Sequence, residues 1–175
     1  MISIKRTIAA AAGMSCAIAA SALAGPELIS FPADYEKGVL YATVDRADNK
    51  QYRELYATPG AIEAAKKGVP LPHGTVLTLV QFAAKLDDKG NPVKDANGRF
   101  IKDKLLAYTV MQKGKGWGAE YPADLRNGEW EYRAFRADRT PNAAAKLENC
   151  FKCHKPLEAR LDFVFTYDRM KSPTR

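Results

Sequence analysis

The sequence predicts an α+β domain that consists mainly of an antiparallel β-sheet with short helices. Two observations support this fold class. Short runs rich in β-branched and aromatic residues follow one another and are separated by Gly, Pro and Asn turn signals, which is typical of strands that pair with their sequence neighbours. Helical patterns are short and stand between or after these runs. A C-x-x-C-H run lies on the predicted C-terminal helix and is followed by a last predicted strand.

Four segments have the pattern of strands. The strongest is 75–84 (TVLTLVQFAA), which follows Gly74 and is rich in β-branched residues. Residues 105–111 (LLAYTVM) predict a return strand. Residues 129–135 (EWEYRAF) and 161–167 (LDFVFTY) alternate between apolar and polar side chains, so they predict two further strands, the second of which closes the domain.

Other segments do not clearly predict one type of secondary structure. Residues 38–44 (GVLYATV) fit either a strand or the start of a helix, and residues 51–57 (QYRELYA) are rich in aromatics without a clear type. The polar segment 87–104 contains Gly90-Asn91-Pro92 and Asn97-Gly98, so it predicts a long hairpin excursion.

Two segments have helical patterns. Residues 61–67 (AIEAAKK) predict a short helix that Gly68 ends. Residues 141–155 predict a second helix, with Thr140 as its N-cap and Pro141 in its first turn.

The second helix carries the most informative motif, Cys150-Phe151-Lys152-Cys153-His154. Helix positions i, i+3 and i+4 share one face, so Cys150, Cys153 and His154 would face one flat group together. The C-x-x-C-H pattern is typical of covalent haem c attachment. It predicts one haem c, bound through the two thiols, with His154 as a ligand of the iron.

Two other interpretations of the motif were weighed. A structural zinc site needs four ligands, and beyond the motif the chain after residue 24 offers only His73. A redox dithiol needs no His after its second Cys, and no clear βαβ pattern surrounds the motif. Both interpretations are less specific than haem c.

The N-terminus predicts export. A short basic region and an apolar run over residues 8–20 precede Ala22-Leu23-Ala24, an A-x-A-like cleavage site. We therefore expect a secretory signal peptide at residues 1–24, cleaved near Ala24, and a single haem domain at 25–175. The apolar run is too short for a membrane span, so the expected location is the periplasm. No structural disulfide is expected, because the thiols that remain are assigned to haem.

The charge pattern limits the kinds of binding partner that we expect. The formal net charge of +7 falls by two when Lys5 and Arg6 are removed. Mixed charges are typical of an ordinary soluble surface, and a modest positive charge also suits docking on an acidic redox partner such as another cytochrome. No nucleic-acid motif is present.

Several motifs in order extend the haem prediction to a family. They are Arg53, Lys66-Lys67-Gly68, the PHGTV segment at 72–76, the GxGWG loop before the W-x-Y-x-x-F segment at 130–135, and ENCFKCHKPLEARLDFVFT near the C-terminus. With them the chain resembles the cytochrome P-460 and cytochrome c′-beta family over roughly residues 35–170. The resemblance implies a mostly antiparallel fold, a homodimer, one haem c per subunit, and iron bound by His154 with its other face open.

Departures from the family pattern favour one branch. In the P-460 branch a lysine on the strand after GTV is crosslinked to the haem and supports hydroxylamine oxidation. Leu79 occupies the matching position here, and the expected distal carboxylate falls near Met111 or Gln112. The resemblance therefore implies a c′-beta-like protein that binds nitric oxide or another small gas in an apolar distal pocket. A hydroxylamine-oxidising enzyme and a simple electron-transfer cytochrome stay as alternatives.

The candidate distal residues are Arg53, Phe82 and Met111. The resemblance implies that Arg53 lies on the distal side or at a haem propionate, and a surface or interface position fits it equally well. Phe82 fits a place over or beside the haem or an ordinary core position, and Met111 fits core packing better than an iron ligand. His73 lies among turn residues, which favours an exposed position over a ligand.

Overall fold

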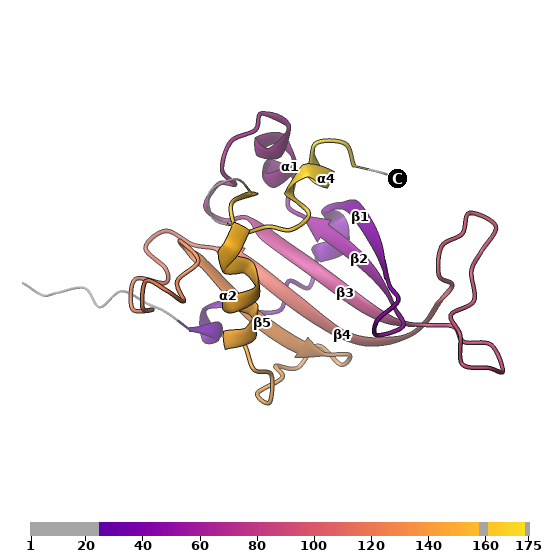
Figure 1. The fold of residues 1–175 in the computed structure, drawn as a ribbon. Coiled ribbons are helices and arrows are strands. Elements are labelled where there is room, and N and C mark those ends of the chain that lie inside the picture. Colours follow the sequence, from indigo (N-terminus) through magenta and orange to yellow (C-terminus); the bar gives the residue numbers. More distant parts are fainter. Residues whose placement is uncertain (1–24, 158–160, 174–175) are drawn as a thin grey trace, which may run out of the picture.

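The computed structural model describes residues 25–157 and 161–173, which form a five-stranded antiparallel sheet with helices beside it and across one face (Figure 1). The strands follow the order β1-β2-β3-β4-β5, so each pairs with its sequence neighbour. Their bounds are β1 Val39–Arg46, β2 Gln51–Ala57, β3 Val76–Ala84, β4 Lys102–Lys113 and β5 Trp130–Arg136. The predicted fold class is therefore confirmed, and the two undecided segments are the strands β1 and β2.

The hairpin excursion between β3 and β4 is also confirmed. It projects from the end of the sheet (Figure 1) and is closed by two isolated bridges, Leu86 with Pro92 and Lys94 with Phe100. Asp87 and Asp95 accept backbone hydrogen bonds within its two turns. The two Asp side chains thus accept hydrogen bonds from backbone N–H groups that have no partner in strand pairing.

The first predicted helix is confirmed, whereas the second is much shorter than the sequence suggested. Helix α1 covers Pro59–Lys66, and α2 covers only Glu148–His154 instead of residues 141–155. Pro141 forms a bridge with Phe135, and the Asn142 amide donates to the Ala134 carbonyl over 2.9 Å, so the chain still runs along β5 at these positions. A proline fits the edge of a sheet as well as a first helical turn, which is why Pro141 misled the prediction.

The predicted last strand over residues 161–167 is wrong. Asp162 and Phe163 have φ values of 45° and 62°, which lie in the left-handed region and end any extended segment. The chain then enters the short helix α4, Tyr167–Met170. Its apolar pattern reflects burial in a turn and a helix: Phe163, Val164, Tyr167 and Met170 are all buried.

The sheet has a hydrophobic cluster on each face. On the face that we call the helix face, Leu77, Met111 and Tyr132 pack with side chains of α1, α2 and the C-terminal segment. The opposite face is covered by the segment before β1, including Ile29 and Phe31, and we call it the N-terminal face. The two clusters place the C-x-x-C-H helix against one side of the sheet only.

No helix within the described ranges is both long and apolar enough to cross a bilayer. The longest of them, α1, has eight residues, whereas a membrane-spanning helix needs about 20.

Met170 tests the packing that replaces the predicted last strand. Its side chain is 0% exposed in the core under α4, so Met170→Ala should lower the free energy of unfolding by about 2–5 kcal/mol. The exposed neighbour Ser172 provides the control, and Ser172→Ala should change it by less than about 0.5 kcal/mol. Denaturant unfolding of both variants and the unsubstituted protein measures these changes. Equal effects of the two variants would contradict the buried position of Met170.

Candidate functional site

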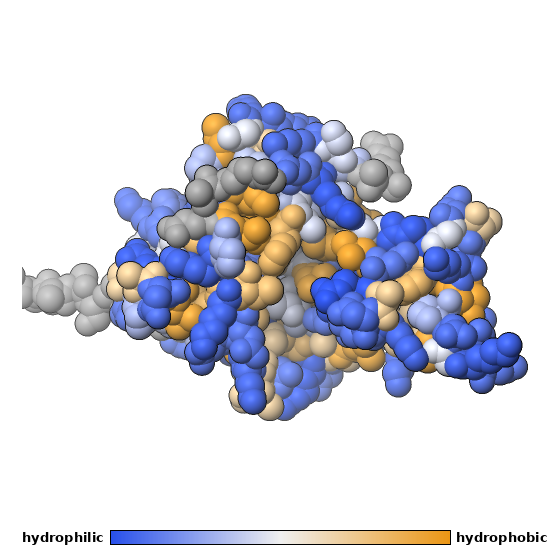
Figure 2. Space-filling model, viewed as in Figure 1, coloured by the Kyte–Doolittle hydropathy of each residue, from blue (hydrophilic) through white to orange (hydrophobic). Residues whose placement is uncertain are grey.

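A cavity of about 380 Å³ separates α2 from the helix face of the sheet. Figure 2 shows hydrophobic side chains gathered around a hollow in this face, with hydrophilic side chains on either side. Its volume is typical of small-molecule and cofactor sites. The lining comes from β1 to β5, α2 and the C-terminal segment, and comprises Tyr41, Val44, Arg46, Arg53, Leu55, Leu77, Thr78, Leu79, Thr109, Met111, Tyr132, Cys150, Cys153, His154, Val164, Phe165 and Thr166.

Helix α2 brings the three motif residues to this cavity. Cys150, Cys153 and His154 all line it, as the i, i+3, i+4 spacing predicted. Both thiols are free, with Cys153 exposed and Cys150 partly buried. Burial raises the pKa of the Cys150 thiol, and the neighbouring Cys153 raises it further. The thiol of Cys150 is therefore protonated at neutral pH.

Contacts from the loop before β5 set the position of α2. The buried Asn127 amide donates to the Tyr132 hydroxyl over 2.8 Å and to the Phe151 carbonyl over 3.1 Å. The Lys155 ammonium, just after α2, donates to the Arg126 carbonyl over 2.7 Å. One buried side chain thus connects the helix to the adjacent sheet strand, so the motif has a defined distance from the sheet.

The imidazole of His154 is held by its Nδ1 atom, which lies 2.6 Å from the Phe163 carbonyl oxygen. A carbonyl can only accept, so Nδ1 carries the hydrogen and Nε2 keeps its lone pair. Burial lowers the pKa of His154, while the hydrogen bond to Phe163 acts in the opposite direction. The ring is flanked by Tyr132 at 5.1 Å and Phe165 at 5.0 Å between centroids. His154 is therefore neutral at pH 7, with one nitrogen available as a ligand.

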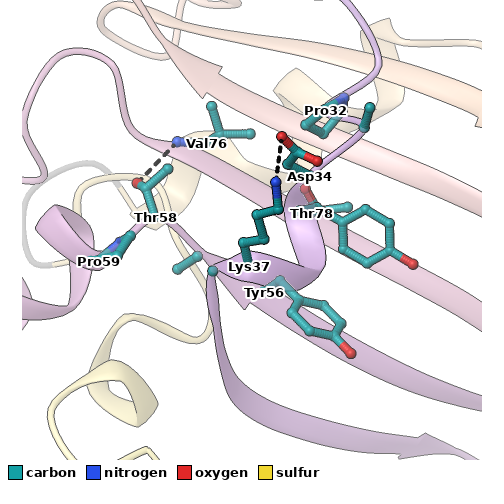
Figure 3. Close-up of a pocket in the computed structure, with 12 residues that line it drawn as sticks. Pro32, Asp34, Lys37, Tyr56, Thr58, Pro59, Val76 and Thr78 are labelled. Atoms are coloured by element: carbon teal, nitrogen blue, oxygen red, sulfur yellow. Dashed lines mark hydrogen bonds and ion pairs between the residues drawn. The ribbon is translucent and has the colours of Figure 1, made fainter.

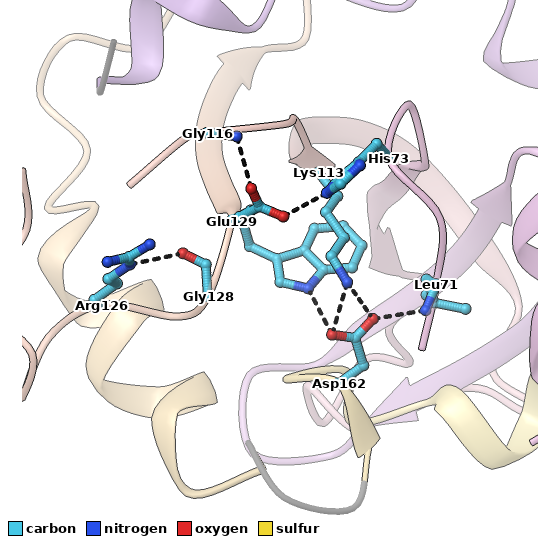
Figure 4. A network of polar contacts seen from close by, with 9 residues as sticks. Leu71, His73, Lys113, Gly116, Arg126, Gly128, Glu129 and Asp162 are labelled. Atoms are coloured by element: carbon cyan, nitrogen blue, oxygen red, sulfur yellow. Dashed lines mark hydrogen bonds and ion pairs between the residues drawn. The ribbon is translucent and has the colours of Figure 1, made fainter. Parts of the chain in front are cut away.

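The Phe163 carbonyl owes its position to the preceding residue, Asp162, whose polar contacts are shown in Figure 4. The Asp162 carboxylate accepts from the Leu71 amide over 2.8 Å, pairs with the Lys113 ammonium at 3.0 Å, and accepts from the Trp130 indole over 3.4 Å. The side chains of Lys113 and Asp162 are only 11% and 12% exposed. Three separate segments thus converge on one carboxylate, which holds the left-handed turn that presents the carbonyl to His154.

A second carboxylate lies beside this network (Figure 4). Glu129 accepts from the Gly116 amide over 2.6 Å and also bonds His73. These two contacts lower the pKa of Glu129, the Gly116 amide having the larger effect. His73 is largely exposed and does not line the cavity, so its position agrees with a turn residue rather than a ligand.

The wall opposite His154 is formed by the sheet. Its side chains include Leu55, Leu77, Leu79 and Met111, with Thr109 as a polar neighbour that accepts from Gln81 over 3.1 Å. Among the described residues that line the cavity there is no lysine and no carboxylate. This wall is therefore predominantly apolar, and Leu79 lies within it.

Two arginines also line the cavity. Arg46 pairs with Asp48 at 2.6 Å on the exposed side. The partly buried Arg53 donates to the neutral Gln51 amide over 2.7 and 2.9 Å. Burial lowers the pKa of Arg53, and the positive charge of Arg46 adds to this effect. Arg53 is thus a cation whose local acceptor carries no charge, an arrangement that suits an incoming anionic group.

The structure separates the three distal candidates. Arg53 and Met111 line the cavity. Phe82 does not, because it packs with the cluster on the N-terminal face and contacts Tyr52 and Lys102. Successive strand residues alternate between faces, and Leu77 and Leu79 already occupy the cavity side of β3. The distal assignment of Phe82 is therefore corrected.

Several residues of the site were not predicted from the sequence. Asp162 and Asn127 act through contacts with residues distant in the chain, which no local pattern reveals. Tyr132 belongs to the W-x-Y-x-x-F motif, so its presence could have been inferred from that motif.

A further cavity of about 410 Å³ lies on the N-terminal face (Figure 3). It contains none of the predicted site residues. Its charged residues, Asp34 and Lys37, pair with each other at 3.2 Å and are largely exposed. The Thr58 hydroxyl accepts from the Val76 amide over 3.4 Å at its edge. These contacts are internal to the fold and point to no ligand.

The Lys113–Asp162 pair yields a direct test of the network. Either Lys113→Met or Asp162→Asn leaves one nearly buried charge without its counter-charge, so each should lower the free energy of unfolding by about 3–5 kcal/mol. The double variant removes both charges, so its loss should be smaller than the sum of the two single losses. Denaturant unfolding of all four proteins measures this coupling. Additive losses would show that the pair does not interact.

Comparison with known protein families identifies the chain. The cytochrome P460 family model matches residues 32–166, which is most of the sequence and includes every described residue of the cavity. No curated protein matches the chain. The chain therefore belongs to the cytochrome P460 family, whose members are haem-binding cytochromes.

Proposed function

We propose that this protein is an exported mono-haem c-type cytochrome that binds nitric oxide or another small neutral gas at an open face of the haem iron. The proposal places one haem, attached through Cys150 and Cys153, in the cavity between α2 and the sheet. It also places the protein in the periplasm after cleavage of residues 1–24. A homodimer and a redox-partner cytochrome stay predictions from the family resemblance.

The residues present fit this cofactor. Two free thiols and a ligating imidazole share one face of a helix beside a mostly apolar cavity. When bound, haem supplies an iron centre that can change redox state and take a diatomic ligand. Arg53 is a suitable partner for a propionate, because its guanidinium lines the cavity without a charged acceptor of its own.

On the helix side, the protein prepares the proximal ligand. The Phe163 carbonyl holds the hydrogen on Nδ1 of His154, so Nε2 is the nitrogen that would bind iron. Such a hydrogen bond orients the ring and increases its basicity as a ligand. Asp162 fixes the carbonyl in turn, which limits rotation of the imidazole.

The sheet-side wall carries the proposal. Leu55, Leu77 and Leu79 face the cavity, and its described lining contains neither a lysine for a haem crosslink nor a carboxylate for proton transfer. An apolar wall favours neutral diatomic ligands, because a buried anion without partners is costly. The wall therefore favours gas binding over hydroxylamine oxidation.

One observation keeps the electron-carrier alternative in view. Met111 lines the cavity from β4, and a methionine thioether can act as a sixth ligand of haem iron. That arrangement would close the iron to gases. The two hypotheses differ in spin state, which makes them easy to separate.

Optical spectra of the purified holoprotein test the proposal. We expect a high-spin iron in both redox states and a clear shift of the ferrous spectrum on addition of carbon monoxide. Mass analysis of the haem peptide should show two thioether bonds and no lysine crosslink. A low-spin spectrum that does not respond to carbon monoxide would exclude gas binding. A lysine crosslink would restore the hydroxylamine-oxidising hypothesis.

A matched pair of variants ties the gas to this cavity. Leu79→Phe adds bulk to the sheet-side wall and should weaken carbon monoxide binding about tenfold, which corresponds to about 1.4 kcal/mol. Leu86→Phe makes the same change on the hairpin excursion, where Leu86 is 45% exposed, and should leave affinity unchanged. Equal affinities for both variants would place the ligand elsewhere.

A further inference from the structure

Gly25 occupies a buried position at the start of the described chain, directly after the predicted cleavage site. Its φ is 129°, and a Cβ on this residue would overlap the Glu27 carboxylate. The positive φ favours glycine at this position, and the Glu27 carboxylate lies beside it. Gly25 is thus buried beside acidic side chains.

One of these side chains is Glu131 on β5, which is 0% exposed. Its Oε2 accepts from the Tyr121 hydroxyl over 3.2 Å, whereas its Oε1 has no hydrogen-bond partner in the described structure. The Gly25 backbone amide acts to lower the pKa of this carboxyl. A buried carboxylate oxygen without a donor is costly, so the site has capacity for one more donor or a cation.

We propose that Glu131, with Glu27, forms the binding site for the α-ammonium group of Gly25 in the processed protein. The inference rests on the proposed export and cleavage. Hydrolysis of the Ala24–Gly25 bond by a peptidase consumes one water and leaves a carboxylate on Ala24. The Gly25 amine then takes up a proton. This ammonium has three N–H donors where the peptide nitrogen had one, and it adds a positive charge beside two acids.

The electrostatics of the site agree with such a ligand. Burial, together with the charge of Glu27, raises the pKa of the Glu131 carboxyl to about 7, although the Tyr121 hydroxyl and the backbone amides of Gly25 and Tyr132 act to lower it. A cation at the Gly25 nitrogen would lower the pKa of Glu131 and keep its carboxylate ionised. The titratable groups around the site are Glu27 in the N-terminal turn, Glu131 and Tyr132 on β5, and Glu120 and Tyr121 in the loop before β5.

The site is also connected to α2 by a packing contact. The Tyr121 ring, whose hydroxyl bonds Glu131, packs on the Phe151 ring of α2 with centroids 4.7 Å apart. Phe151 is the residue after Cys150. A processed N-terminus bound at Glu131 would therefore brace the same helix that carries the C-x-x-C-H motif.

The experiment begins with the full precursor, exported in a host that attaches haem c. Intact mass and N-terminal sequencing of the product establish where it starts, and a start other than Gly25 overturns the cleavage on which the inference rests. Haem spectra of the same sample report separately on the gas-binding proposal. The α-amino group is then labelled by reductive ¹³C-methylation, and its NMR signal is followed with pH.

In the mature protein we expect the α-amino pKa at least one unit above its ordinary value of about 7.7–8.0. Glu131→Gln should return it to that range, while Glu63→Gln on α1, which removes an exposed acid, should not. A version extended by Ser-Ala before Gly25 keeps Glu131 but removes the ammonium, and it should melt several degrees lower. An ordinary pKa in the unsubstituted protein, or no difference in melting, would overturn the proposal.

Discussion

The carboxylate of Asp162 is the contact on which the rest of the site depends. It joins the Leu71 amide, the Lys113 ammonium and the Trp130 indole, which come from three separate segments. These bonds hold two successive left-handed residues, Asp162 and Phe163, in a conformation that is otherwise unfavourable. The turn aims the Phe163 carbonyl at His154. A surface ion pair contributes little to stability. The Lys113–Asp162 ion pair is nearly buried, so the loss of one partner should lower the free energy of unfolding strongly.

The cavity follows from two walls with different chemistry. Helix α2 supplies the thiols and the imidazole, and the buried Asn127 sets its position against β5. The sheet supplies an apolar surface because its strands place every second side chain on this face. Polar anchoring on one side and apolar packing on the other suit a cofactor that is bound through one face and left open on the other.

The sequence predicted the antiparallel sheet, the hairpin excursion and the placement of Cys150, Cys153 and His154 on a helix, since each depends on local periodicity and spacing. It misplaced the last strand, because burial of Phe163 and Val164 in a turn resembles strand alternation. The distal assignment of Phe82 was wrong for a related reason, because alternation shows that a strand has two faces but not which face lies toward the cofactor. Asp162 could not be assigned a role from sequence, because Leu71, one of its partners, lies 91 residues away.

Resonance Raman spectroscopy of the ferrous holoprotein, with ¹⁵N-labelled histidine, tests the central claim most directly. That claim is a proximal His154 held through Nδ1, with the opposite face of the iron open. The account predicts an iron–histidine stretching band that shifts with the label, and a further shift of this band in Asp162→Asn, where the turn behind the Phe163 carbonyl is loosened. Marker bands of a six-coordinate low-spin iron, or a band unchanged in Asp162→Asn, would contradict the account.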